Sequence, residues 1–237
     1  CSSDLSPEWQ RKKLEGTLKR PSLVELFRPG LRKTTIVTTL MFACAYGAAF
    51  GSIQQSPQMT PGLKEVAAMT PSARGEAVSS VQSMQETGGL LGRIVMAGLA
   101  LVIVSRRALL RLFLIPGFFI TAYVFTYSAN ESLSAMRVGI FCAGFTTVAL
   151  LTFWGNYLPR VFPVHLRGTG EGLAANVGGR MMGTFASYIV THLSANMPGS
   201  GASTKLAYAA AIVGSSTYVI AFVLSFFMPE PGEAPLE

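Results

Sequence analysis

Six stretches of mostly apolar residues, separated by polar segments, dominate the hydrophobicity pattern of this chain. Each is long enough to supply the roughly 20 residues that a helix needs to cross the apolar core of a bilayer. We therefore expect six transmembrane helices, at about 34–57, 78–104, 108–128, 134–158, 170–193 and 205–228. The connections are short except for residues 58–77, which are polar and interrupted by prolines.

Composition supports a membrane protein. Half of the 237 residues are hydrophobic and 13% are charged, which is about half the charged fraction of an ordinary soluble domain. Of the three cysteines, Cys44 and Cys142 lie inside apolar runs, which favours packing thiols over a disulfide framework. His165 and His192 are isolated from each other, and no group of nucleophile, base or metal ligands is visible at membrane depth. We therefore expect neither an enzyme nor a metal site.

The basic residues are distributed unequally between the two sides of the expected bundle. Thirteen of the 19 Lys and Arg lie in the N-terminal segment or in the second-to-third and fourth-to-fifth connections, which share one side. Because basic residues accumulate on cytoplasmic connections, this side is predicted to be cytoplasmic, with both ends of the chain inside. The net charge of +7 is thus a topology signal and does not indicate a nucleic-acid surface.

Residues 156–172 form a short basic connection that reads N-Y-L-P-R-V-F-P-V-H-L-R-G-T-G-E-G. Its pattern F-P-x-x-x-R-G-T-G resembles the cytoplasmic loop before the eleventh helix of major facilitator superfamily (MFS) transporters. A second element, G-x-x-x-D-R-x-G-R-R, is only partly matched: Gly98 and the closing Arg106-Arg107 agree, but Val102 and Ile103 replace the Asp and its basic neighbour. Arg160 also replaces an acid usual in sugar porters. The gating residues that the resemblance implies are Arg106, Arg107, Phe162, Pro163, Arg167, Gly168 and Gly170.

The resemblance implies an all-α membrane protein, the C-terminal half of a twelve-helix fold, whose six helices form two inverted three-helix repeats. Residues 6–33 would be the cytoplasmic central loop, with a capping box at Ser22-x-x-Glu25. Residues 34–228 would be the transmembrane domain and 229–237 a cytoplasmic tail. Residues 1–5 resemble the translated tail of a sequencing adapter, and we exclude them from the fold. The expected location is a bacterial inner (plasma) membrane.

Spans two and five share a motif, because Gly92-Arg93 and Gly179-Arg180 both lie near the middle of their helix. Matching intramembrane features in inverted units are typical of alternating-access transporters. An arginine at the bilayer centre costs at least about 2.5–3.5 kcal/mol, so both side chains need a polar cavity or partners. Glu86 shares a helix face with Arg93, Asn176 shares one with Arg180, and two amides end span one. The predicted substrate-binding residues are Arg93, Arg180, Glu86, Gln54, Gln55 and Asn176.

Other interpretations of these features remain open. The arginines could be held by carbonyls and by partners in an upstream half, and Arg137, in the outer turns of its span, is expected to reach the interface. Small residues at four-residue spacing, Gly47-x-x-x-Gly51 in span one and Gly179-x-x-x-Gly183 in span five, indicate close helix packing.

Two arginines against one acid favour a small organic anion such as a carboxylate as substrate. The alternatives are a neutral sugar-like or polyspecific drug-like substrate, or a membrane adaptor that transports nothing. The expected partners are membrane lipid, the substrate and an upstream six-helix half, without nucleic acid. No cofactor is expected, and coupling to protons or sodium ions is left open.

Overall fold

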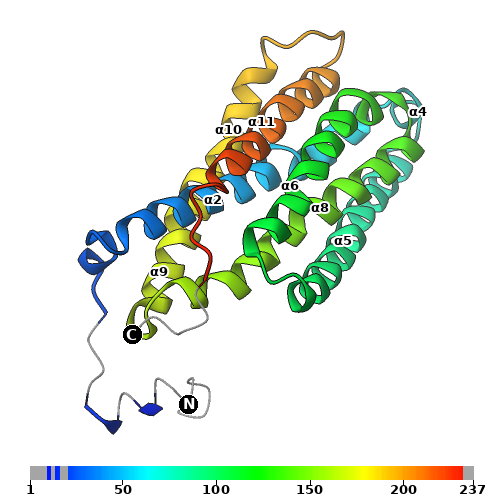
Figure 1. Ribbon diagram of the computed structural model, residues 1–237. Helices are drawn as coiled ribbons and strands as arrows, with labels where there is room; N and C mark the ends of the chain where they lie inside the picture. The colour runs from blue at the N-terminus through cyan, green and yellow to red at the C-terminus, as the bar shows by residue number, and fades with distance from the viewer. Residues whose placement is uncertain (1–9, 12–13, 17–20, 232–237) are drawn as a thin grey trace.

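The computed structural model describes residues 10–11, 14–16 and 21–231, and within them the regular secondary structure is entirely helical. Figure 1 shows an elongated bundle of long helices, with α10 and α5 at opposite edges and α2, α11, α6 and α8 between them. The expected all-α architecture is confirmed. Residues 1–5 and most of the predicted tail lie outside the described residues.

The long helices coincide with the predicted spans. They are α2 (Arg32–Gly51), α5 (Pro71–Val102), α6 (Arg106–Tyr123), α8 (Leu133–Val161) and α11 (Ala202–Leu224). The fifth predicted span consists of α9 (Arg167–Leu173), a π-helical stretch η6 (Ala174–Gly183) and α10 (Phe185–Ser194). The short elements are η1 (Val24–Phe27), η2 (Ile53–Gln55), α3 (Ser56–Met59), η3 (Thr60–Gly62), α4 (Lys64–Ala67), the π-helical η4 (Val124–Ser128), α7 (Ala129–Glu131) and η5 (Val164–Leu166).

Four helical segments of the described chain are long and apolar enough to cross a membrane: Arg32–Gly62, Arg106–Glu131, Leu133–Val161 and Ala202–Leu224. They match predicted spans one, three, four and six. Helix α5 has the length, but its Glu86 and Arg93 make it less apolar, and span five is divided into three elements. The structure therefore supports an integral membrane protein with four candidate spans.

The connection at residues 58–77 is more ordered than its prolines suggested. It contains η3 and α4, and α5 begins at Pro71, seven residues before the predicted start. Pro57, Pro61 and Pro71 each occupy one of the first two positions of a helical element. Proline is tolerated there, because its missing N–H would have had no partner within the helix. The prolines therefore start helices in this segment.

Glycines bring two pairs of helices into close contact. A Cβ added at Gly88 or Gly92 of α5 would overlap the carbonyl oxygen of Phe141 or Phe145 in α8. A Cβ added at Gly178 of η6 would likewise overlap the carbonyl oxygen of Thr39 in α2. Small residues let two backbones approach in this way, as in membrane helix pairs. The glycine faces of predicted spans two and five thus pack against spans four and one.

Packing elsewhere follows a related pattern. Helix α6 contacts α8, α11 contacts α2, and α6 and α11 contact each other. Gly47 and Gly51 of α2 face Thr217 and Val213 of α11, where a Cβ would press on either side chain. The small-residue spacing predicted in spans one and five is therefore a packing surface in this structure.

Candidate functional site

Arg93 lies in α5 and Arg180 lies in η6. The glycine before each arginine is buried against a neighbouring helix, whereas both arginine side chains are exposed. Within the described chain, neither guanidinium forms an ion pair or a side-chain hydrogen bond. Because α5 packs on α8 and η6 packs on α2, the two arginines come from separate parts of the bundle. Each is available to an external partner.

The stretch that carries Arg180 is π-helical over ten residues. A π-helix is wider than an α-helix and is uncommon beyond one turn, and such stretches occur often at functional sites. Asn176, Arg180 and Thr184 are all exposed, and so are Met181 and Met182 between them. The Asn176 side-chain amide donates to the carbonyl oxygen of Gly172 at 2.8 Å, and its oxygen stays accessible.

A partly buried polar network links residues of three predicted spans, with Gln55, Ser56 and Gln85 buried and Glu86 exposed. The Gln55 amide donates to the carbonyl oxygen of Phe50 at 2.7 Å and to the Ser187 hydroxyl of α10 at 2.9 Å. The neighbouring Ser56 hydroxyl donates to Gln85 Oε1 of α5 at 3.4 Å, and the Gln85 amide donates to Glu86 Oε1 at 3.3 Å. Two predicted site residues, Gln55 and Glu86, are thereby connected through two residues that sequence analysis did not select.

The network leaves one polar atom without a partner. Gln55 Oε1 is buried and has no hydrogen-bond partner within the described residues. The amide hydrogens of Gln55 are already used inside the protein, so this residue offers an acceptor in this conformation. Gln54 differs, because its side chain is exposed. Residues 52–56 contain two glutamines and two serines, and this run of polar residues in the sequence could have pointed to Ser56.

The basic connection before α9 is folded back on itself. A Cβ at Gly170 would lie 2.9 Å from the ring of Phe162, so the first and last residues of the F-P-x-x-x-R-G-T-G pattern touch. Arg167 Nε donates to the carbonyl oxygen of Phe162 at 3.4 Å. Pro163 is buried in the same turn, whereas Gly168 is exposed. The sequence pattern therefore describes a compact turn that begins the fifth span.

The other gating pair, Arg106-Arg107, is held by Glu230 from the C-terminal segment. The Glu230 carboxylate accepts from the Ser105 hydroxyl at 2.7 Å and from the backbone N–H groups of Arg106 and Arg107, each at 3.0 Å. A carboxylate at a helix N-terminus satisfies donors that have no partner within the helix. Arg107 Nε also donates to the Met228 carbonyl oxygen at 2.6 Å. The segment after α11 thus caps the N-terminus of α6.

The pKa of Glu230 reflects these contacts. Burial alone would raise it, but the hydrogen bonds from Ser105 and from the backbone of Arg107 and Arg106, together with the charge of Arg107, hold the pKa below its ordinary value of 4.5. Sequence analysis placed Glu230 in an undifferentiated tail, because its partners lie more than 120 positions earlier in the chain.

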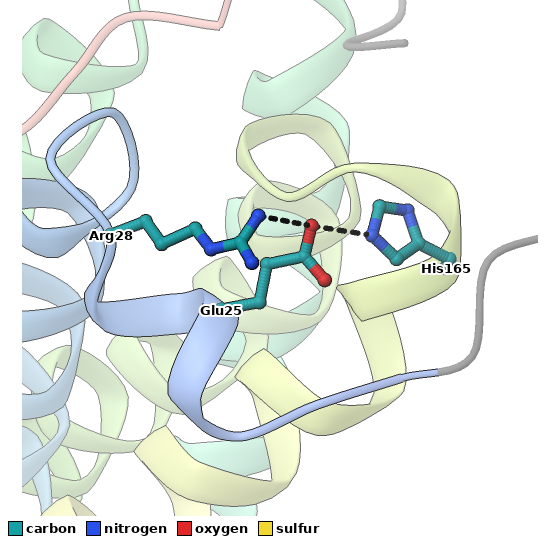
Figure 2. Close-up of polar contacts among 3 residues, drawn as sticks. All are labelled: Glu25, Arg28 and His165. Atoms are coloured by element: carbon teal, nitrogen blue, oxygen red, sulfur yellow. Dashed lines mark ion pairs between the residues drawn. The ribbon is translucent and has the colours of Figure 1, made fainter.

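A second charged group joins the segment before α2 to the turn before α9. Figure 2 shows Glu25 between His165 and Arg28, with Glu25 Oε1 at 3.3 Å from His165 Nε2 and 4.0 Å from Arg28 Nη1. His165 Nε2 lies within ion-pair distance of Glu25 but forms no hydrogen bond with it. The predicted capping box is not formed, since η1 has no side-chain cap and Glu25 turns to His165.

Chemically, the arrangement can bind and position charged or polar solutes. Among the described residues, no group of three or more His, Cys, Asp or Glu could hold a metal ion. The candidate site residues therefore form separate groups: the exposed Arg93 on α5, the exposed Arg180 on η6, and the amide, hydroxyl and carboxylate network of Gln55, Ser56, Gln85 and Glu86. No family model matches the chain, and no curated protein or solved structure matches it.

Proposed function

We propose that this chain is the C-terminal six-helix half of an MFS-type secondary transporter, which moves a small organic anion, most simply a carboxylate, by alternating access. The observation that carries the proposal is the paired placement of Arg93 and Arg180. Each follows a glycine packed on another helix, and each points away from that contact. The pattern is what two inverted three-helix units facing a common cavity would give.

The choice of an anion rests on charge. Both guanidinium groups lack an acidic partner within the described residues, and a guanidinium can bind a carboxylate through two parallel hydrogen bonds. Glu86 and the Gln55 network would supply polar contacts at another part of the cavity. The upstream half would supply the second wall. The proposed location is a bacterial inner membrane with both ends of this chain in the cytoplasm.

Substitution of the two arginines in the full-length protein tests the proposal. Arg93→Lys and Arg180→Lys keep the charge but lose the two-pronged geometry, so apparent substrate affinity should fall about tenfold or more, since a hydrogen bond to a charged group is worth about 1.5–3 kcal/mol. Arg→Gln should lower it further. Transport into liposomes and melting temperature are measured on the same purified variants.

Arg137→Lys is the matched control, because Arg137 Nε already donates to the Ser80 hydroxyl at 2.8 Å and has a structural explanation. It should lower the melting temperature and leave substrate affinity unchanged. If the Arg93 and Arg180 variants behave like this control, the anion site is wrong, and a neutral or drug-like substrate becomes the better explanation. Absence of any transport by the full-length protein would favour a membrane adaptor.

A further inference from the structure

An apolar groove of about 180 Å³ lies between α6 and α11, two helices that are side by side in the bundle (Figure 1). The buried Leu114 and Tyr218 and the exposed Ile115, Phe119 and Val219 line it. None of its lining residues is charged. The groove therefore offers its occupant apolar surface, which is stabilised when an apolar chain covers it.

The two helices that form the groove are the least covered by protein among the four candidate spans. In the segments that contain α6 and α11, 44% of the most apolar stretch is buried, compared with 67% and 61% in the other two. An apolar helix that lies in a membrane and is only partly covered by protein meets lipid over the rest of its surface. The groove is therefore open to acyl chains.

Arg111 lies at one end of the groove, one helical turn before Ile115. Its Nε donates to the Ser225 hydroxyl at 2.9 Å. Its guanidinium carbon lies 4.1 Å from the centre of the Phe226 ring and 5.8 Å from that of Phe222, which also lines the groove. Among the described residues, Arg111 has no carboxylate within ion-pair distance, and its two terminal nitrogens have no partner. A guanidinium held in this way presents a fork of N–H groups to an anion.

The order of residues places Arg111 on the membrane-surface side of the groove. On α6 the groove residues follow Arg111 towards the middle of the span, and on α11 they precede Ser225 in the same sense. Helix side chains lean towards the N-terminus of their helix, so Arg111 leans towards the surface. From Arg111 to Phe119 the groove extends roughly 12 Å along α6, at 1.5 Å per residue. This length fits within the roughly 15 Å that one leaflet contributes to the apolar core of a bilayer.

The surface beside Arg111 has an excess of positive charge. Arg107 lies one turn earlier on the same face of α6, and Arg106 precedes it. The one acid in contact with this helix start is Glu230 among the described residues, and it accepts from Ser105 and from the backbone of the two arginines. Three arginines against one carboxylate leave a positive surface, which attracts anionic headgroups.

We propose that an anionic phospholipid binds at this place, with its phosphate on Arg111 and one acyl chain in the groove between α6 and α11. Basic pockets between membrane helices bind anionic headgroups in this way. A free phosphate would leave the groove uncovered, and a zwitterionic lipid would bring its own cation close to Arg107. The inference requires only that the chain lies in a membrane, so it stands or falls separately from the transported substrate.

Photocrosslinking with two lipid probes tests the site. The full-length protein is placed in phosphatidylcholine nanodiscs that contain a small fraction of phosphatidylglycerol or of phosphatidylcholine, each with the same photoactivatable acyl chain. Adducts are mapped by mass spectrometry. At Ile115, Phe119 and Val219 the phosphatidylglycerol probe should give about tenfold more adducts than the phosphatidylcholine probe, the ratio expected for a hydrogen bond to a charged group. The excess should disappear in Arg111→Gln and persist when inorganic phosphate is added.

A second apolar groove serves as the internal reference. It has a volume of about 540 Å³, lies between α2, α10 and α11, and is lined by Ile212 and Ile220 among others, with no charged residue. The two probes should label it equally. Lys33→Gln is the control variant, because it removes an exposed basic residue at the start of α2 and should leave the excess between α6 and α11 unchanged.

Equal labelling of the groove between α6 and α11 by the two probes would overturn the proposal. An equal excess in both grooves would do the same, because it would indicate a general attraction of anionic lipid to the protein. An excess that survives Arg111→Gln would place the headgroup elsewhere, and loss of the excess on addition of inorganic phosphate would replace the lipid site by a free-anion site. Absence of adducts from both probes would mean that protein covers the groove. If Arg111→Gln does not fold, the comparison of probes and grooves in the unaltered protein still decides.

Discussion

Four arginines of the helical bundle fall into two kinds of environment. Arg106 and Arg137 each donate to a neighbouring residue within the bundle. Arg93 and Arg180 are exposed and have no such partner among the described residues. Since a charge at membrane depth is costly without partners, the second pair requires a ligand, a partner chain or water. This difference is the residue-level basis of the proposed anion site.

Glu230 gives a prediction for acid pH. Its pKa is lowered in the folded protein, so its contribution to stability is present above the ordinary value of 4.5 and is lost as the pH falls through the lowered pKa. Glu230→Gln removes the titrating group. Melting temperature against pH should therefore fall less steeply below about pH 4.5 in Glu230→Gln than in the unaltered protein.

Glu76→Gln serves as the control for Glu230, because Glu76 is an exposed carboxylate on α5 without a contact of this kind among the described residues. Its profile should run parallel to that of the unaltered protein. Identical profiles for both variants would mean that the contact between Glu230 and the start of α6 does not form in solution.

At the scale of elements, the contact between α5 and α8 depends on backbone approach. Gly88→Ala or Gly92→Ala would push a methyl group into a carbonyl oxygen of α8, and backbone cannot move aside as a side chain can. Overpacking of this kind typically costs about 1–3 kcal/mol. Both variants should show a lower melting temperature in detergent than the unaltered protein.

Gly75→Ala lies on the same helix and is the matched comparison. A Cβ there meets nothing within 4 Å, and alanine stabilises an exposed helix position by about 0.5–1 kcal/mol relative to glycine. An unchanged or higher melting temperature is therefore expected. If Gly88→Ala gives the same result as Gly75→Ala, the close approach of α5 and α8 is wrong.

Sequence patterns predicted the long helices well and their interruptions poorly. Apolar runs located α2, α6, α8 and α11, because burial in lipid needs only length and apolarity. The π-helical stretch of span five was not predicted, since it forms where Gly178 and Gly183 pack on α2 and local periodicity carries no information about that neighbour. Residues 58–77 were described as a polar connection interrupted by prolines, whereas Pro61 lies at the start of η3 and Pro71 at the start of α5.

The site could be predicted only in part, because several of its contacts join residues that are far apart in the sequence. The helix face of Arg93 and Glu86 could be derived from spacing alone. The link from Gln55 to Ser187 joins residues 132 positions apart and appears only when α2 and α10 are in place. Glu25 illustrates the same limit, because Ser22-x-x-Glu25 fits a local capping box, yet the carboxylate pairs with His165.

At the scale of the whole molecule, the helix contacts of spans one to three resemble those of spans four to six. Predicted span two packs on span four, and span five packs on span one in the same way. Likewise, span three packs on span four, and span six packs on span one. One such half supplies a single wall of a cavity between two halves. Residues 6–237 alone should therefore not catalyse uptake into liposomes, whereas co-expression with the upstream half should restore it. Robust uptake by residues 6–237 would contradict the half-transporter proposal.

Orientation in the membrane gives the last prediction. The predicted spans assign thirteen of the 19 basic residues to the side of the Pro163–Gly168 turn, so this side should be cytoplasmic and the segment around α4 external. Ala68 and Gly168 are both exposed, and a Cβ at Gly168 meets nothing within 4 Å, so cysteines at these positions should be tolerated. In intact cells a membrane-impermeant maleimide should label Ala68→Cys at once and Gly168→Cys only after permeabilisation. The unaltered protein, in which Cys44 is buried and Cys142 half-buried, measures the background. The opposite labelling would invert the topology and place the Arg106-Arg107 and Glu230 contact outside the cell.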